Sequence, residues 1–325
     1  MEICTGVKDK DSLRKYIRAG ATEFYCGVID ERWLNKYNYV IPLNRRPWKE
    51  ANFKSFSELQ EAIKIAHDND CKVFYTLNEH VYNNQQLELI KLQIEKLIVI
   101  DIDAIIISDF GLVKFLRSNG YVNEIHMSTG ALALNANAAK FYRDELKVDR
   151  VVLPRSLSIK EINTIARDVT NIDYEIFVKN EGCTYIDGYC NLIHGVKYLS
   201  KDCSVQYNPP CEIHYNVLDI SNSTVSSECI KAEKRLNRVI SSKSNCGVCG
   251  LYLLDRNHIK SLKVVSRDTN EKKIERDILC VKEAIEMCDS IDNFKEYKKI
   301  VQAKLCNNII EKKIIHCYYP EILNI

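Results

Sequence analysis

The sequence predicts an α/β fold of the (β/α)8 TIM-barrel-like type, with a cysteine-rich insertion between strands 7 and 8. Short apolar segments alternate strictly with amphipathic helical segments, as in a parallel sheet. The expected strands number eight, which is the number that closes such a barrel. Only 11 Gly and 6 Pro occur among 325 residues, which excludes low-complexity segments and long flexible linkers. A doubly wound open sheet is the alternative fold for the same alternation.

The eight expected strands include a continuously apolar one, Ala104–Ser108, of the kind that is buried on both faces of a parallel sheet. They are Glu2–Val7, Glu23–Val28, Lys72–Leu77, Ala104–Ser108, Glu124–Ser128, Arg150–Leu153, Tyr174–Lys179 and Ser261–Val265. Helices are expected where apolar residues recur every three or four positions. They are Lys10–Ala19, Ser57–Asn69, Leu87–Ile98, Gly111–Ser118, Asn137–Leu146, Ile159–Asp168 and Asp277–Asp289. Gly20 ends the first helix, Ser55 or Ser57 begins the second, and Ser158 with Glu161 forms a capping box.

The chain divides into one large domain and a tail. Residues 1–290 form the barrel domain, which includes the cysteine-rich insertion at 181–255. Residues 291–325 are first basic and then apolar and aromatic, and we expect this tail to pack on the barrel. Residues 29–53 read as a long connection between the second strand and the second helix.

Composition narrows the function classes. The formal net charge is +2, which excludes a globally basic nucleic-acid coat and an acidic disordered tail. The first residues lack the pattern of a secretory signal, and no apolar run reaches the length of a membrane span. We therefore expect a cytoplasmic protein with no membrane partner. A reducing compartment does not favour disulfides, so 14 cysteines indicate metal binding, redox chemistry or chance.

Twelve of the 14 cysteines fall into two groups. Five lie in apolar strands or on helical patterns and are expected to be ordinary core residues. They are Cys4, Cys26, Cys71, Cys280 and Cys288. A second group is concentrated in about a fifth of the chain, where a ligand site is expected. It comprises Cys183, Cys190, Cys203, Cys211, Cys229, Cys246 and Cys249.

The carboxyl ends of the expected strands are polar, and in a barrel these ends form the functional mouth. His126 is one such residue. Four cations follow or end the late strands, and together they suit a carboxylate or phosphate ligand. They are Arg155, Lys179, Lys263 and Arg267. Polar strand ends are common in any barrel, which is the alternative interpretation at each single position.

Several segments resemble the peptidase U32 family in order and spacing. They are HMSTGALALNANAAKFY (126–142), VDRVVLPRSLSIKEI (148–162), EIFVKNEGCTYIDGYC (175–190) and SLKVVSR (261–267). The likeness covers about residues 1–290. The chain departs from the family pattern at Gly130, Ser156, Ser266 and the pair Lys179–Asn180, all expected at the mouth. The resemblance therefore does not identify the substrate.

The resemblance implies a [4Fe–4S] site and oxygen-independent hydroxylation of a nucleobase or a small molecule. A carboxylate such as prephenate is the implied hydroxyl source, and RNA or a paired U32 subunit the implied partner. Carried over to this chain, the ligands are Cys183, Cys190, Cys211 and either Cys249 or Cys246. Zinc is the alternative metal, but only Cys246 and Cys249 have zinc-ribbon spacing.

Two other function classes stay open. The family name implies a collagenase-like peptidase, but the chain has neither an HEXXH nor a GxSxG motif. An RNA-binding modification scaffold is the second alternative, because one loop mixes cations with an aromatic residue. These residues are Arg45, Arg46, Trp48 and Lys49. The same loop could simply fold over the barrel end, and no catalytic residue is assigned.

Overall fold

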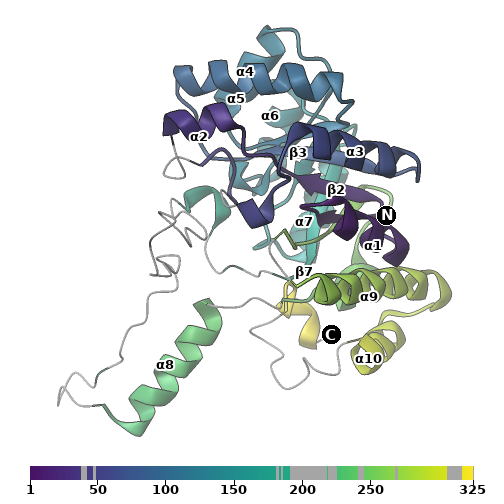
Figure 1. Ribbon diagram of the computed structural model, residues 1–325. Helices are drawn as coiled ribbons and strands as arrows, with labels where there is room; N and C mark the ends of the chain where they lie inside the picture. The colour runs from purple at the N-terminus through teal and green to yellow at the C-terminus, as the bar shows by residue number, and fades with distance from the viewer. Residues whose placement is uncertain are drawn as a thin grey trace.

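Eight parallel strands form a closed barrel in sequence order in the computed structural model (Figure 1). The structure describes residues 1–37, 42–46, 49–180, 183, 186–190, 218, 225–240, 245–267, 270–305 and 317–324. The strands are β1 Glu2–Gly6, β2 Glu23–Cys26, β3 Lys72–Leu77, β4 Ala104–Ile107, β5 Glu124–Met127, β6 Arg150–Val152, β7 Asp173–Lys179 and β8 Ile259–Val264. β8 pairs with β1 and closes the barrel, so the predicted TIM-barrel-like fold is confirmed.

Ten α-helices are described, and all of them except α8 lie around the outside of the barrel (Figure 1). They are α1 Lys10–Ala19, α2 Glu31–Tyr37, α3 Phe56–His67, α4 Asn84–Val99, α5 Phe110–Ser118, α6 Ala136–Asp144, α7 Ile159–Asp168, α8 Ser227–Ile240, α9 Glu271–Ser290 and α10 Phe294–Leu305. Short 3-10 helices are η1 Lys49–Ala51, η2 Thr129–Ala131, η3 Asp187–Tyr189, η5 Val248–Leu253 and η7 Pro320–Asn324. The sequence interpretation missed α2, which lies in the expected long connection, as well as α8 and α10.

Local sequence signals set several helix ends. Gly20 takes a left-handed conformation, with φ of 106°, after α1. The Ser55 side chain accepts a hydrogen bond from the backbone N–H of Glu58 at the start of α3. Ser55, and not Ser57, is therefore the N-cap of this helix. The predicted capping box at α7 is present, because Ser158 and Glu161 each bond the other's backbone.

The insertion and the tail meet near the end of β7. α8 lies away from the barrel in Figure 1, whereas η5 returns the chain to β8 and packs against α9 and α10. The Tyr319 hydroxyl donates to the Phe177 carbonyl of β7 at 2.9 Å. The Tyr318 hydroxyl donates to the Asn180 carbonyl. The described part of the tail therefore contacts the strand that leads into the insertion.

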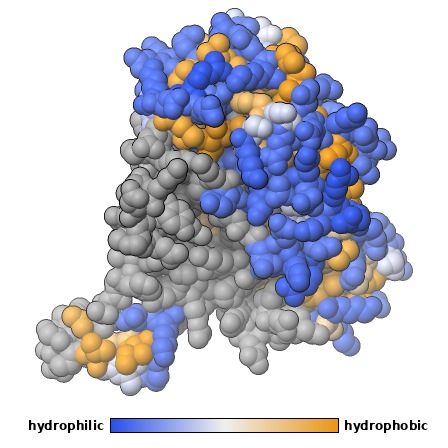
Figure 2. Space-filling view, viewed as in Figure 1, coloured by the Kyte–Doolittle hydropathy of each residue, from blue (hydrophilic) through white to orange (hydrophobic). Residues whose placement is uncertain are grey.

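The hydrophobic core has two parts. A small cluster fills the barrel interior and comprises Cys4, Tyr25, Phe74, Ala104 and Ile106. The larger part lies between the strands and the outer helices. The exposed helix faces in Figure 2 are mostly hydrophilic, with smaller hydrophobic patches. No described helix is both long and apolar enough to cross a membrane.

Candidate functional site

The turn that carries Cys183 and Cys190 lies at the barrel mouth. It follows β7 and contains η3, and the Cys190 carbonyl is 3.1 Å from the imidazole Nε2 of His80, which follows β3. Asp187, between the two cysteines, accepts hydrogen bonds from Thr129 Oγ1 at 2.9 Å and Arg155 Nε at 3.0 Å. Because these partners follow β3, β5 and β6, the turn is docked across the carboxyl ends of the strands.

The two candidates for the fourth ligand differ in position. Cys246 is buried and its backbone pairs with Lys179 at the end of β7 and with Cys317. Cys249 lies in η5, where it is partly buried against the hydrophobic core. Cys211 lies outside the described residues. The described cysteines among the predicted ligands are not in disulfides.

The cysteines predicted to be core residues behave as such. Cys4, Cys26, Cys71 and Cys288 are buried, and Cys280 is half-buried. Burial raises the pKa of the Cys26 thiol to about 12 and that of Cys71 to about 11. These thiols are protonated at neutral pH and are poor nucleophiles. Cys229, expected in a loop, lies in α8, and Cys203 lies outside the described residues.

Two of the predicted cations, Arg155 and Lys179, contact carboxylates of the chain itself at the mouth. Arg155 bonds Asp187, and its guanidinium lies 4.4 Å from the centre of the Phe177 ring. Lys179 Nζ is 3.7 Å from an oxygen of Asp277 in α9. Two of the four cations therefore serve the protein's own contacts at the mouth.

Arg267 lies at the mouth, where neighbouring residues contact its side chain on several sides. Its Nη1 donates to Thr76 Oγ1 at 3.0 Å, and its Nη2 donates to Asn44 Oδ1 at 3.3 Å. The guanidinium also lies 5.8 Å from the centre of the Tyr25 ring. The backbone at Gly6 approaches it so closely that an added Cβ would lie 2.5 Å from Arg267 Cγ. These contacts, from neutral side chains and an aromatic face, fix the orientation of the guanidinium.

The fourth cation, Lys263, lies inside the barrel, in a buried ion-pair network that the sequence interpretation missed. Lys263 donates to Glu175, and its Nζ lies 4.2 Å from the centre of the Tyr25 ring. Arg150 donates both terminal nitrogens to the Glu23 carboxylate, each at 2.7 Å, and one lies 3.5 Å from Glu175. Charged residues within β2, β6, β7 and β8 were the available sequence signal.

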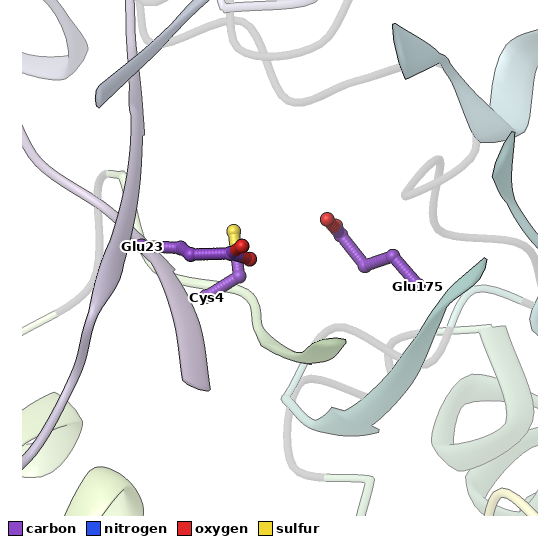
Figure 3. Close-up of side chains that lie close together, drawn as sticks. All are labelled: Cys4, Glu23 and Glu175. Carbon is purple, nitrogen blue, oxygen red and sulfur yellow. The ribbon is translucent and has the colours of Figure 1, made fainter. Parts of the chain in front are cut away.

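Cys4, Glu23 and Glu175 point toward one another in this network (Figure 3). One ligand atom from each lies within 4.8 Å of the others, as in a metal site. However, Arg150, Lys263 and Ser261 already occupy the carboxylate oxygens. Burial raises the pKa of Glu175, but Lys263 and Arg150 outweigh burial and leave that pKa below its usual value. The arrangement is that of a charge-balanced internal network.

His126 was predicted at the mouth and lies in the barrel interior, against the Phe74 ring. Its Nε2 is 3.3 Å from Glu124 Oε2, and its Nδ1 has no hydrogen-bond partner among the residues described. Burial lowers the pKa of His126, and the hydrogen bond that its imidazole donates to Glu124 does not restore that pKa to its usual value. The imidazole is therefore neutral at pH 7 and serves as a donor to Glu124.

Because folding lowers the pKa of His126, the neutral imidazole contributes fully to stability above the unfolded pKa of about 6.5. This contribution is lost as the pH falls below that value. We expect the free energy of unfolding to fall between pH 7.5 and pH 5, with at most about 1.4 kcal/mol per pH unit from this one proton. Urea unfolding of wild type and His126→Asn across this range measures the difference in slope. Glu124, whose pKa this hydrogen bond lowers to about 2, titrates outside the window. Parallel curves would contradict the prediction.

Known proteins resemble this chain in sequence. The profile of Peptidase family U32 matches residues 8–321. A tRNA hydroxylation protein P of Helicobacter pylori is 34% identical over 190 residues, which are 58% of this chain and 42% of that protein. An uncharacterized protease of Methanocaldococcus jannaschii is 32% identical over 198 residues, 59% of this chain and 44% of that protein.

A 23S rRNA 5-hydroxycytidine C2501 synthase of Escherichia coli is 26% identical over 216 residues, 66% of this chain and 30% of that protein. The matched region thus spans less than half the length of these curated relatives. The profile match covers nearly the whole chain, and it agrees with the resemblance that the motifs predict. The chain belongs to peptidase family U32.

Proposed function

We propose that this chain is a [4Fe–4S] enzyme, or a subunit of one, that hydroxylates a nucleobase in RNA without molecular oxygen. The names of the tRNA and rRNA hydroxylation relatives support the reaction class. The observation that carries the proposal in this chain is the docking of the Cys183–Cys190 turn on the barrel mouth. Reacting groups in this fold gather at that end.

The donors that are described suit an iron–sulfur cluster. Cys183, Cys190, Cys246 and Cys249 are not in disulfides, and soft thiolates are the ligands such clusters take. Cys190 and Cys246 both adjoin the carboxyl end of the strands. We propose Cys183, Cys190, Cys211 and one of Cys246 or Cys249 as the ligand set. A [4Fe–4S] cluster held there would supply one-electron redox chemistry.

The reaction exchanges a hydrogen atom on the base for a hydroxyl group. With a hydroxylated carboxylate donor such as prephenate, R–H and D–OH become R–OH and D–H. We propose that Arg267 binds the carboxylate of the hydroxyl-donating molecule. Asn44 and Thr76 accept hydrogen bonds from its guanidinium and hold it in place at the mouth. Tyr189, 72% exposed and next to Cys190, offers an aromatic face on which an unpaired base would stack.

The loop cations that suggested RNA binding are partly engaged within the chain. The Arg45 side chain donates to Glu79 at 2.8 Å, and its backbone N–H to Asn78 at 3.2 Å. The Arg46 side chain donates to the Arg45 carbonyl. Trp48 lies outside the described residues. These contacts support a loop that folds over the barrel end, so we place the RNA contact at the mouth instead.

Anaerobic purification followed by an RNA modification assay tests this function. We expect brown protein with about four irons per chain. RNA that lacks the modification should gain one oxygen atom per target base, measured by nucleoside mass spectrometry, only when the carboxylate donor is added. The assay is run with and without a co-expressed second U32 chain, because a paired subunit is part of the proposal. Colourless, zinc-containing protein would overturn the cluster, and hydroxylation of an added small molecule with no modification of RNA would overturn the RNA substrate.

A further inference from the structure

We propose that Asp187 is the positioning residue of the cysteine turn, and that Arg155 and Thr129 act through it to hold Cys183 and Cys190 on the barrel mouth. Arg155 then belongs to the protein's own support of the metal-binding turn, and the substrate carboxylate is bound elsewhere. The inference rests on the proposed function only in that the two cysteines hold the cluster. The docking itself can be tested in protein without metal.

The bond between Arg155 and Asp187 has the features of a strong ion pair. The two side chains are only 13% and 18% exposed, so water screens their charges little. Phe177 supports the planar guanidinium from one side at 4.4 Å. A charge-assisted bond of this kind is stronger than a neutral one, and stacking fixes the direction in which Nε points.

Thr129 adds a second bond to the same carboxylate oxygen of Asp187. The next residue, Gly188, sits directly on the loop after β5: an added Cβ would lie 2.3 Å from Leu132 Cγ and 2.6 Å from the Gly130 carbonyl oxygen. His80 bonds the Cys190 carbonyl from the loop after β3. Three loops of the mouth therefore fix the middle and the end of the turn.

Asp187 lies four residues after Cys183 and three before Cys190. Fixing the residue between two ligands restricts both, because few backbone rotations separate each cysteine from the fixed point. A preformed turn removes part of the ordering cost of metal binding. The same contacts determine which side chains surround the sulfurs, and these surroundings tune a cluster's reduction potential.

Thiol labelling of the metal-free protein tests the docking directly. In Asp187→Ala we expect iodoacetamide to label Cys190, which is 9% exposed in the wild type, about tenfold faster. Thr129→Val should show a smaller increase in the same direction. Labelling of Cys71, near the opposite end of the barrel, should not change. Asp144→Asn, which breaks a surface Arg–Asp pair in α6, is the matched control and should leave Cys190 protected. Unchanged labelling of Cys190 in Asp187→Ala would overturn the proposal.

Two further measurements separate this role from its alternatives. In the iron-loaded protein, Asp187→Ala should release iron to a chelator faster and shift the cluster's midpoint potential, with Asp187→Asn intermediate. Arg155→Lys should speed Cys190 labelling without raising the KM for the carboxylate donor. A raised KM with unchanged labelling would instead assign Arg155 to the substrate. If wild-type protein binds no iron but the labelling results hold, the proposed cluster is wrong and the docking of the turn stands.

Discussion

Cys183→Ala should reduce the bound iron from about four atoms per chain to nearly none and abolish the [4Fe–4S] EPR signal. Cys190→Ala and Cys211→Ala should have the same effect, because a cluster that lacks one of its four cysteine ligands loses its iron readily. The proteins are purified anaerobically, and iron is measured per folded chain. Circular dichroism checks that the barrel is retained, which we expect because Cys183 and Cys190 lie outside the barrel strands.

Matched cysteine variants make this result specific. Cys71→Ala removes a buried thiol outside the mouth and should keep all of the iron. Cys246→Ala and Cys249→Ala decide the fourth ligand, since only one of them should lose the cluster. Retention of iron in Cys183→Ala, or its loss in Cys71→Ala, would show that the ligand assignment is wrong.

The barrel could be predicted from sequence because its signals are local. Strand length, helix periodicity and caps such as Gly20 and the Ser158–Glu161 box all lie within one element or its ends. The family motifs then placed the cysteine turn after β7. α2 was missed because it is short and lies in a segment without a clear apolar period.

The partners of the charged residues could not be predicted in the same way. Arg150 and Glu23 are 127 residues apart, and only closure of the barrel brings them together. Arg155 and Lys263 were recognised as cations on late strands, but their spacing does not show which carboxylate faces them. The structure places Asp187 beside the first and Glu175 beside the second. A charge within a strand that should be buried on both faces is the signal for such an internal pair.

Arg150→Met should destabilise the folded protein by about 3–5 kcal/mol, because it leaves Glu23 buried without its bidentate partner. Lys263 remains near Glu175 but bonds that carboxylate, so it does not replace the lost charge. Urea unfolding at pH 7 measures the loss. Arg143→Met, which removes an exposed pair with Asp144, should destabilise the protein much less and serves as the control.

A second substitution tests whether the loss arises from the unpaired charge. Glu23→Gln in the Arg150→Met background removes that charge, so the double variant should be more stable than the single one. Lowering the pH should act in the same direction, because an unpaired buried carboxylate has a raised pKa and takes up a proton. The deficit of Arg150→Met should therefore shrink between pH 7 and pH 5. An equal deficit at both pH values, with no recovery in the double variant, would instead attribute the loss to packing around Phe74, whose ring lies 5.2 Å from the Arg150 guanidinium.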